Sequence, residues 1–123
     1  MSTSSPLPEI DPIHFERVWA ADLSVLENLE RNGDQPWVPR LIDVGFRGEP
    51  EALDALSVFA QDLGFSDLRD EDSAESGILL IGREQTADVL SIKELTRLSL
   101  QLEALFGVEL DGWGCVAQTG TKQ

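Results

Sequence analysis

The fold is decided by residues 78–114, which read ILLIGREQTADVLSIKELTRLSLQLEALFGVELDGWG. The run Ile78–Ile81 is short and wholly apolar, which predicts a strand at the centre of a sheet. Ser91 and Glu94 have the spacing of a capping box, so we expect a long helix to begin at Ser91. The stretch therefore predicts a strand, a helix and a final strand, which is half of an α+β domain.

The helix in this stretch has one apolar face and ends at a glycine. Its inner stripe consists of Ile92, Leu95, Leu98, Leu102 and Leu105 or Phe106. Gly107 tolerates the positive φ that often terminates a helix. A last strand is then expected over residues 108–118, interrupted by the glycine-tryptophan-glycine sequence at 112–114.

The preceding residues repeat the same order of elements. Leu41–Phe46 alternates loosely and predicts a strand. Residues 48–51 open a second helix with acidic side chains that suit the positive end of a helix dipole. The helix ends at Gly64, and a strand follows at Phe65–Arg69. The whole pattern is the βαββαβ order of a ferredoxin-like fold, an antiparallel sheet with two packed helices.

An extra helix precedes this unit. Between Pro12 and Asn32 the apolar residues recur at near-helical spacing, with Asp11 as the N-cap. Gly33 follows the helix and is a natural terminator. We expect this helix to cover either a sheet edge or the helix layer.

Size and composition fit one globular domain. The 123 residues are 41% hydrophobic, which is enough to bury a core without a disulfide or a structural metal. We expect the domain to occupy residues 11–118. Residues 1–10, rich in Ser and Pro, are predicted to be a flexible tail, and residues 119–123 a second, short tail.

The charge balance is strongly acidic. Twenty-three Asp and Glu residues face nine Lys and Arg residues, giving a formal net charge of −14. Such a field repels nucleic acid and anionic membranes and attracts a basic protein partner. Solubility alone would also explain the charge, so composition leaves both explanations open.

The cysteine count and the absence of long apolar runs indicate where in the cell the protein is expected. Cys115 is the only cysteine, so no intramolecular disulfide can form. Residues 1–9 lack the features of a signal peptide, and no apolar run has the length of a membrane span. We expect a soluble, cytoplasmic protein.

Residues that could carry catalysis are isolated from one another in the sequence. His14 has no Cys or second His at metal-ligand spacing, and Cys115 has no neighbouring His or Lys to lower its pKa. The sequence contains no phosphate-binding loop, dinucleotide fingerprint or nucleophile elbow. We therefore expect no enzyme and no cofactor or metal, with an enzyme or small-ligand site on the open face of the sheet as the alternative.

An acidic cluster lies between the second and third expected strands. It consists of Asp70, Glu71, Asp72 and Glu75, and it lacks the pattern of an EF-hand. A solvated hairpin tip is one interpretation, and a contact for a basic partner is the other. Catalytic carboxylates need burial or a charged neighbour to adjust their pKa. A turn with this much charge provides little burial.

The segment Asp111-Gly112-Trp113-Gly114 is the most unusual local feature. Glycines within a strand mark a bulge or a close backbone approach. Trp113 then either fills the core or a gap under the first helix, or serves with Asp111 as an exposed anchor for a partner.

Two stretches together resemble the regulator of ribonuclease E activity B family. The first is VLENLERNGD at residues 25–34, followed by Pro39-Arg40 and the strand to Phe46; the second is FGVELDGWG at residues 106–114. The resemblance extends over roughly residues 14–118, with Gly33, Asp34, Gly112 and Gly114 as its structural positions. It implies a ferredoxin-like domain and a non-catalytic protein that binds ribonuclease E and lowers its RNA processing.

The leading hypothesis is therefore an acidic inhibitor or adaptor that binds a basic region of an RNA-processing enzyme, with ribonuclease E as the implied partner and no direct contact with nucleic acid. An immunity or antitoxin-like protein that neutralises a basic toxin would have the same charge and is the alternative. The sheet edge of a ferredoxin-like fold can also pair with another chain, so the oligomeric state stays open.

Overall fold

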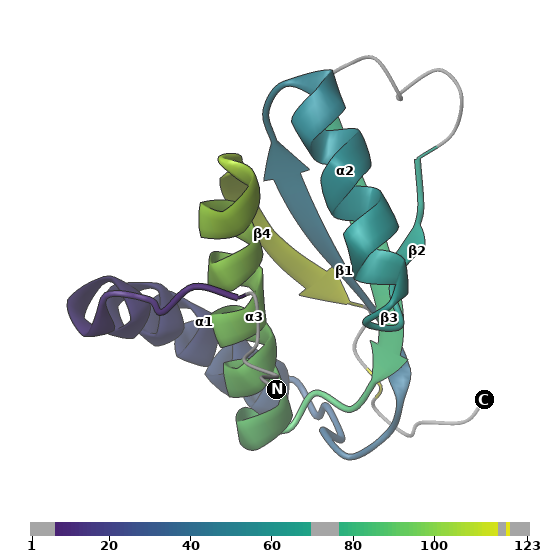
Figure 1. Cartoon of the computed structure of the whole chain (residues 1–123). Coiled ribbons are helices and arrows are strands. Elements are labelled where there is room, and N and C mark those ends of the chain that lie inside the picture. Colours follow the sequence, from purple (N-terminus) through teal and green to yellow (C-terminus); the bar gives the residue numbers. More distant parts are fainter. Residues whose placement is uncertain (1–6, 70–76, 116–117, 119–123) are drawn as a thin grey trace, which may run out of the picture.

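The computed structural model describes residues 7–69, 77–115 and 118. Three helices and four strands follow one another in the order α1 (Pro12–Arg31), β1 (Arg40–Arg47), α2 (Pro50–Gln61), β2 (Ser66–Asp67), β3 (Ile78–Gln85), α3 (Val89–Phe106) and β4 (Glu109–Cys115). The strands form one antiparallel sheet in the order β2-β3-β1-β4. Figure 1 shows α2 and α3 on the same face of this sheet.

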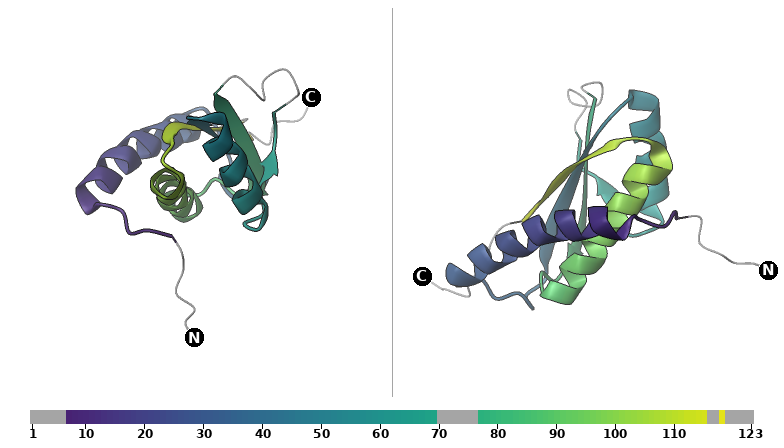
Figure 2. Two further views of the ribbon diagram at one scale, coloured as in Figure 1. Left: turned by 45° about the horizontal axis from the view of Figure 1, so that its top comes forward. Right: turned by 90° about the vertical axis from the view of Figure 1, so that its left-hand side faces the viewer.

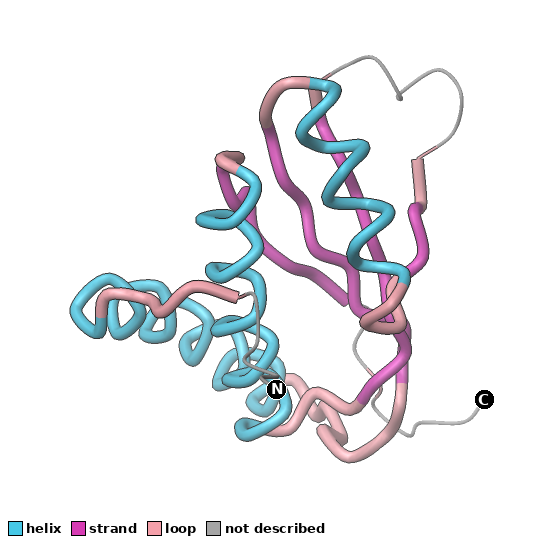
Figure 3. The backbone as a smooth tube through the Cα atoms, viewed as in Figure 1, coloured by secondary structure: helices cyan, strands magenta, loops and turns pink. Residues whose placement is uncertain are grey.

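The α+β, ferredoxin-like prediction is confirmed. After α1, the elements run βαββαβ, and the two central strands are β1 and β3, each flanked on both sides by a neighbour. The apolar run Ile78–Ile81 lies in β3 and is therefore central, as its composition predicted. Figure 3 shows the strands in one layer with α2 and α3 against it.

The core lies between the sheet and the helix layer because side chains alternate along each strand. Ile42, Val44 and Phe46 of β1 are buried, and the register places Ile81 opposite Val44 and Leu79 opposite Phe46. Directly opposite residues share a face, so these side chains form one apolar surface under α2 and α3. The two helices meet above it, where the rings of Phe59 and Phe106 pack edge to face with centroids 5.5 Å apart.

Helix α1 covers the helix layer, which confirms one of its two expected positions. It begins at Asp11, whose Oδ1 accepts a hydrogen bond from the backbone N–H of Ile13 at 3.2 Å. Phe15, Trp19 and Leu26 are buried, and the helix packs mainly on α3. Figure 2 shows α1 crossing α3 beside strand β4. None of the helices in the described part of the chain is long and apolar enough to cross a membrane.

Three predicted details are wrong: the start of α3, the interruption of the last strand, and the length of the strand expected at Phe65–Arg69, which spans only Ser66–Asp67. Helix α3 begins at Val89 because Asp88, not Ser91, is its N-cap; an Asp88 side-chain oxygen accepts the Ser91 backbone N–H at 3.1 Å. The residues at 112–114 do not interrupt the last strand, since β4 continues through them to Cys115. Of the expected N-terminal tail, residues 7–10 pack against the core through Leu7 and Ile10, and residues 1–6 lie outside the described residues.

Candidate functional site

Strand β4 contains a bulge. Its pairing with β1 places Leu110 opposite Phe46 and Gly112 opposite Gly45, so Asp111 is an extra residue with no partner. Gly112 has a φ of +130°, a conformation that a residue with a Cβ rarely adopts. The expectation that these glycines mark a bulge is confirmed.

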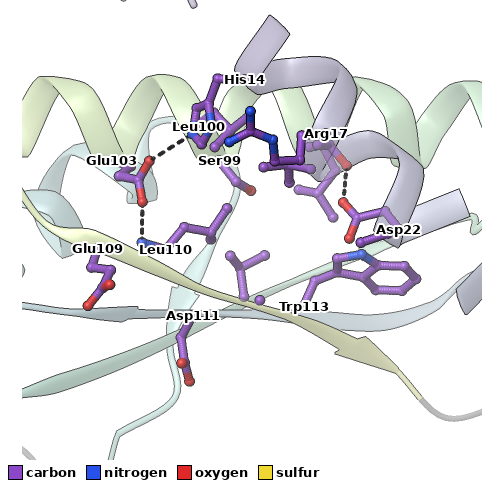
Figure 4. Close-up of a pocket in the computed structure, with 16 residues that line it drawn as sticks. His14, Arg17, Asp22, Ser99, Leu100, Glu103, Glu109, Leu110, Asp111 and Trp113 are labelled. Carbon is purple, nitrogen blue, oxygen red and sulfur yellow. Dashed lines mark hydrogen bonds and ion pairs between the residues drawn. The ribbon is translucent and has the colours of Figure 1, made fainter. Parts of the chain in front are cut away.

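The bulge decides where three side chains point. In a regular strand, residues three apart lie on opposite faces, but one extra residue returns Trp113 to the same face as Leu110. Trp113 lies opposite Val44 and packs against the core under α1. Asp111 points away from the helices (Figure 4), and its Oδ1 lies 3.3 Å from Nε of Arg47, with both side chains about half exposed.

A groove of about 540 Å³ lies between α1, α3 and β4. Its interior is mainly apolar and is formed by Val18, Val44, Leu95, Leu100, Leu110 and the ring of Trp113. Polar side chains lie at both ends (Figure 4). Such a cavity, with a few polar groups in an apolar lining, has the character of a binding site.

One end of the groove holds Asp22. Its Oδ2 accepts a hydrogen bond from Oγ1 of Thr96 at 2.6 Å, and Trp113 donates a second hydrogen bond to the carboxylate. Burial raises the pKa of Asp22, while these two hydrogen bonds act to lower it. No Lys, Arg or His of the described chain lies within ion-pair distance of this carboxylate.

The other end of the groove is closed by Glu103. One carboxylate oxygen accepts the backbone N–H of Leu110 at 2.6 Å, and the other lies 3.9 Å from Nε2 of His14. Glu103 thereby connects α3 to β4 and approaches α1. Arg17 of α1 lies above the same end of the groove (Figure 4).

The turn after α1 contains a buried ion pair. Nη1 of Arg40 lies 2.7 Å from Oδ1 of Asp34, and the two side chains are 2% and 3% exposed. The same oxygen accepts the backbone N–H of Gln118 at 2.6 Å, while Nη2 of Arg40 donates to the carbonyl of Gln35 at 2.7 Å. Asp34 therefore ties the end of α1 to β1 and to the chain beyond β4.

The sequence-predicted site residues fall into separate places. Asp111 and Trp113 are close in the chain but face opposite sides of the sheet. Gly33 follows α1 with a φ of +88°, and Gly114 lies opposite Asp43. The acidic cluster of Asp70, Glu71, Asp72 and Glu75 lies outside the described residues.

The two candidate reactive side chains have ordinary surroundings. His14 is exposed and lines the groove beside Glu103. Cys115 lies opposite Ile42 at the end of β4, and burial raises the pKa of its thiol, although a hydrogen bond with Arg40 opposes the shift. Arg40 is a neighbour of Cys115 in the fold, although the two residues are far apart in the sequence. A raised pKa disfavours the thiolate, which is the reactive form of a cysteine.

Many basic side chains are held against groups of the protein itself. A guanidinium hydrogen bond from Arg69 lowers the pKa of Asp67 to about 2, and Arg83 donates to the carbonyl of Leu63 at 3.0 Å. The exposed acidic residues are thus poorly balanced by free cations. Further contacts of basic side chains are Arg69 with Asp54, Arg83 over the Phe65 ring, Arg97 over the Phe15 ring and Lys93 near the Trp19 ring.

Comparison with known proteins gives one family. The model described as "Regulator of ribonuclease activity B" matches residues 19–115, a span that includes most of the residues lining the groove, the bulge of β4 and the buried Asp34–Arg40 pair. The search of curated proteins finds no match.

Proposed function

The chain belongs to the regulator of ribonuclease activity B family, and from this premise we propose that it is a non-catalytic protein that binds and inhibits a basic RNA-processing enzyme. Ribonuclease E is the partner that the resemblance in the sequence implies. We propose further that residues 11–118 act as one domain and that the protein works in the cytoplasm, where such an enzyme meets RNA.

The observation that carries this proposal is the uncompensated acidic surface. The chain has a net charge of −14, and several cations of the described residues are engaged within the fold: Arg40 is buried, while Arg69 and Arg83 are bound to neighbouring groups. Exposed carboxylates lie on every helix and on the sheet, namely Glu16, Glu27, Glu30, Glu49, Glu51, Glu84, Glu94 and Glu109. Such a surface attracts a partner that carries clustered Lys and Arg.

Inhibition follows from competition for one surface. An enzyme that processes RNA must present basic side chains to phosphate groups. Carboxylates of this protein would occupy or lie beside that basic region and so weaken its attraction for RNA. Because the attraction is between exposed charges, salt should screen it.

The test measures binding of the purified chain to purified ribonuclease E, together with cleavage of an RNA substrate, at increasing salt. We expect tight binding and slow cleavage at low salt, with a steep loss of affinity as salt rises. Absence of binding, or binding that is unchanged by salt, would contradict the proposal.

Two variants matched in charge show where the carboxylates act. In the first, Asp70, Glu71, Asp72 and Glu75 are changed to their amides. In the second, the exposed residues Glu9, Glu16, Glu27 and Glu30 are changed to Gln. If the acidic cluster is the contact, the first variant loses much more affinity than the second; equal losses would leave net charge alone as the cause.

A further inference from the structure

The groove between α1, α3 and β4 contains a carboxylate that the fold does not neutralise. Asp22 receives hydrogen bonds from Thr96 and Trp113 but no cation from the described chain. By contrast, Glu103 at the other end receives the N–H of Leu110 and lies near His14. A half-buried carboxylate without a counter-ion raises the question of what binds next to it.

We propose that this groove receives a short segment of the protein partner in which a bulky apolar side chain adjoins a Lys or Arg. The proposal rests on the proposed function and identifies the binding site for the partner. The apolar side chain would lie along the interior of the groove, and its basic neighbour would reach Asp22.

The shape and lining of the groove fit an apolar side chain. Its volume of about 540 Å³ lies in the range of sites that enclose a ligand, roughly 300–1,000 Å³. Leu95 and Leu100 of α3 form one wall, and Leu110 and Trp113 of β4 form the other. Trp113 presents both an apolar ring and a polar N–H, a combination enriched at protein interfaces.

The charge of the groove selects a cation. Asp22 and Glu103 are the lining residues whose carboxylates lie between the helices and β4, and Arg17 is the one permanent cation among the lining residues. An opposite charge beside a partly desolvated carboxylate offsets the cost of its burial. The same negative charge disfavours a phosphate or a nucleic acid, and the net charge of −14 disfavours a second copy of the chain.

The edge of β4 indicates how the segment is recognised. An edge strand can pair with an added strand through its free backbone groups. However, the N–H of Leu110 is already bound by Glu103, and the bulge at Asp111 breaks the regular ladder. Recognition is therefore expected through side chains in the groove and not through strand addition along β4.

The first test follows the indole N–H resonances of the isotope-labelled protein as three short blocked peptides are added. One peptide alternates Leu with Lys and Arg, one keeps the cations but has Gly for Leu, and one keeps Leu but has Ser for the cations. We expect the first peptide to bind most tightly and to shift the indole signal of Trp113. The signals of buried Trp19 and exposed Trp37 serve as internal references. Equal binding of all three peptides, or shifts that omit Trp113, would overturn the proposal.

The second test blocks the groove with a matched control. Ala21 and Ala20 are both exposed on α1, but only Ala21 lines the groove. Ala21→Phe fills the groove, whereas Ala20→Phe places the same ring outside it. We expect Ala21→Phe and Asp22→Asn to lose about tenfold or more in peptide affinity, which corresponds to about 1.4 kcal/mol, and Ala20→Phe to bind as the unmodified chain does.

Measuring the same variants against ribonuclease E separates this inference from the proposed function. If Ala21→Phe weakens both peptide and ribonuclease binding, the groove is the binding site for the partner. If Ala21→Phe still binds and inhibits the ribonuclease as Ala20→Phe does, the inference is overturned while the proposed function stands. If the unmodified chain binds the peptide but not the ribonuclease, the proposed function fails, and so does the assignment of the segment to that enzyme.

Discussion

Two aspartates, one in the middle of α1 and one just after it, have different surroundings. Asp34, just after α1, is almost fully buried, with the guanidinium of Arg40 at 2.7 Å and the N–H of Gln118 at 2.6 Å. Asp22, within α1, is half-buried, receives hydrogen bonds from neutral donors and has no cation within the described chain. The first carboxylate is satisfied by the fold, whereas the second is left with capacity for a partner.

The largest expected effect is a loss of stability on removal of the Asp34 carboxylate. Asp34→Ala leaves Arg40 as a buried charge without its counter-ion and removes the acceptor of the Gln118 N–H. Loss of one member of a buried pair costs about 3–5 kcal/mol. Urea denaturation should therefore show a large decrease in the free energy of unfolding, with a lower midpoint.

The matched control is the exposed pair of Arg47 and Asp111. Their side chains are 58% and 49% exposed, and such surface pairs contribute about 0–1 kcal/mol. Asp111→Ala should therefore change stability little. If the two alanine variants unfold at the same urea concentration, Asp34 does not have the structural role assigned to it.

A smaller effect is expected from Gly112→Ala. Its φ of +130° is unfavourable for any residue with a Cβ, although the space around it is open, so we expect a loss of about 1–3 kcal/mol. Relief of that strain would turn Trp113 out of the groove, which its fluorescence would report. Gly114→Ala, where φ is not positive, is the control, and an equal change in both variants would show that the bulge conformation is not the cause.

Much of the fold could be predicted because its signals are local. The apolar run Ile78–Ile81, the Asp11 cap and the glycines after each helix depend on neighbouring residues only. The bulge could be anticipated from Gly112 and Gly114 for the same reason. The start of α3 could not be ranked correctly, because Asp88 and Ser91 both satisfy the chemistry of an N-cap and only the backbone path selects between them.

The groove could not be predicted because its parts come from distant segments. Asp22 and Thr96 are 74 positions apart, yet their side chains lie within 2.6 Å. Nothing in the neighbourhood of Asp22 in the sequence distinguishes it from the other acidic residues of α1. Trp113 was singled out by its glycines, but its direction depends on the extra residue in the β4 ladder. The sequence resemblance rests partly on Gly33-Asp34 and Pro39-Arg40. The ion pair between Asp34 and Arg40 could not be predicted from it, because the pair depends on the path of the turn between them.

The smallest change in stability, and the most informative about the groove, is expected at Asp22. Burial raises the pKa of this carboxyl in the folded chain, so the native state binds the proton more readily than the unfolded state does. The charged form therefore weakens the fold above the folded pKa, and this cost disappears as pH falls below the unfolded value. Asp22→Asn removes this pH dependence and loses part of one hydrogen bond, so its stability at neutral pH should stay within about 1 kcal/mol of the unmodified chain.

Direct titration of the Asp22 carboxyl by NMR converts the comparison with Asp34 into a measurement. In the free protein we expect a pKa above the usual range for aspartate, and a value at or below that range would contradict a desolvated carboxylate. Addition of the Leu-Lys-Arg peptide should lower the pKa, because a cation in the groove favours the charged form. By linkage, the peptide must then bind more weakly as pH falls through the titration of Asp22. With the peptide bound, Asp22 would have a cationic counter-ion, as Asp34 already has in Arg40.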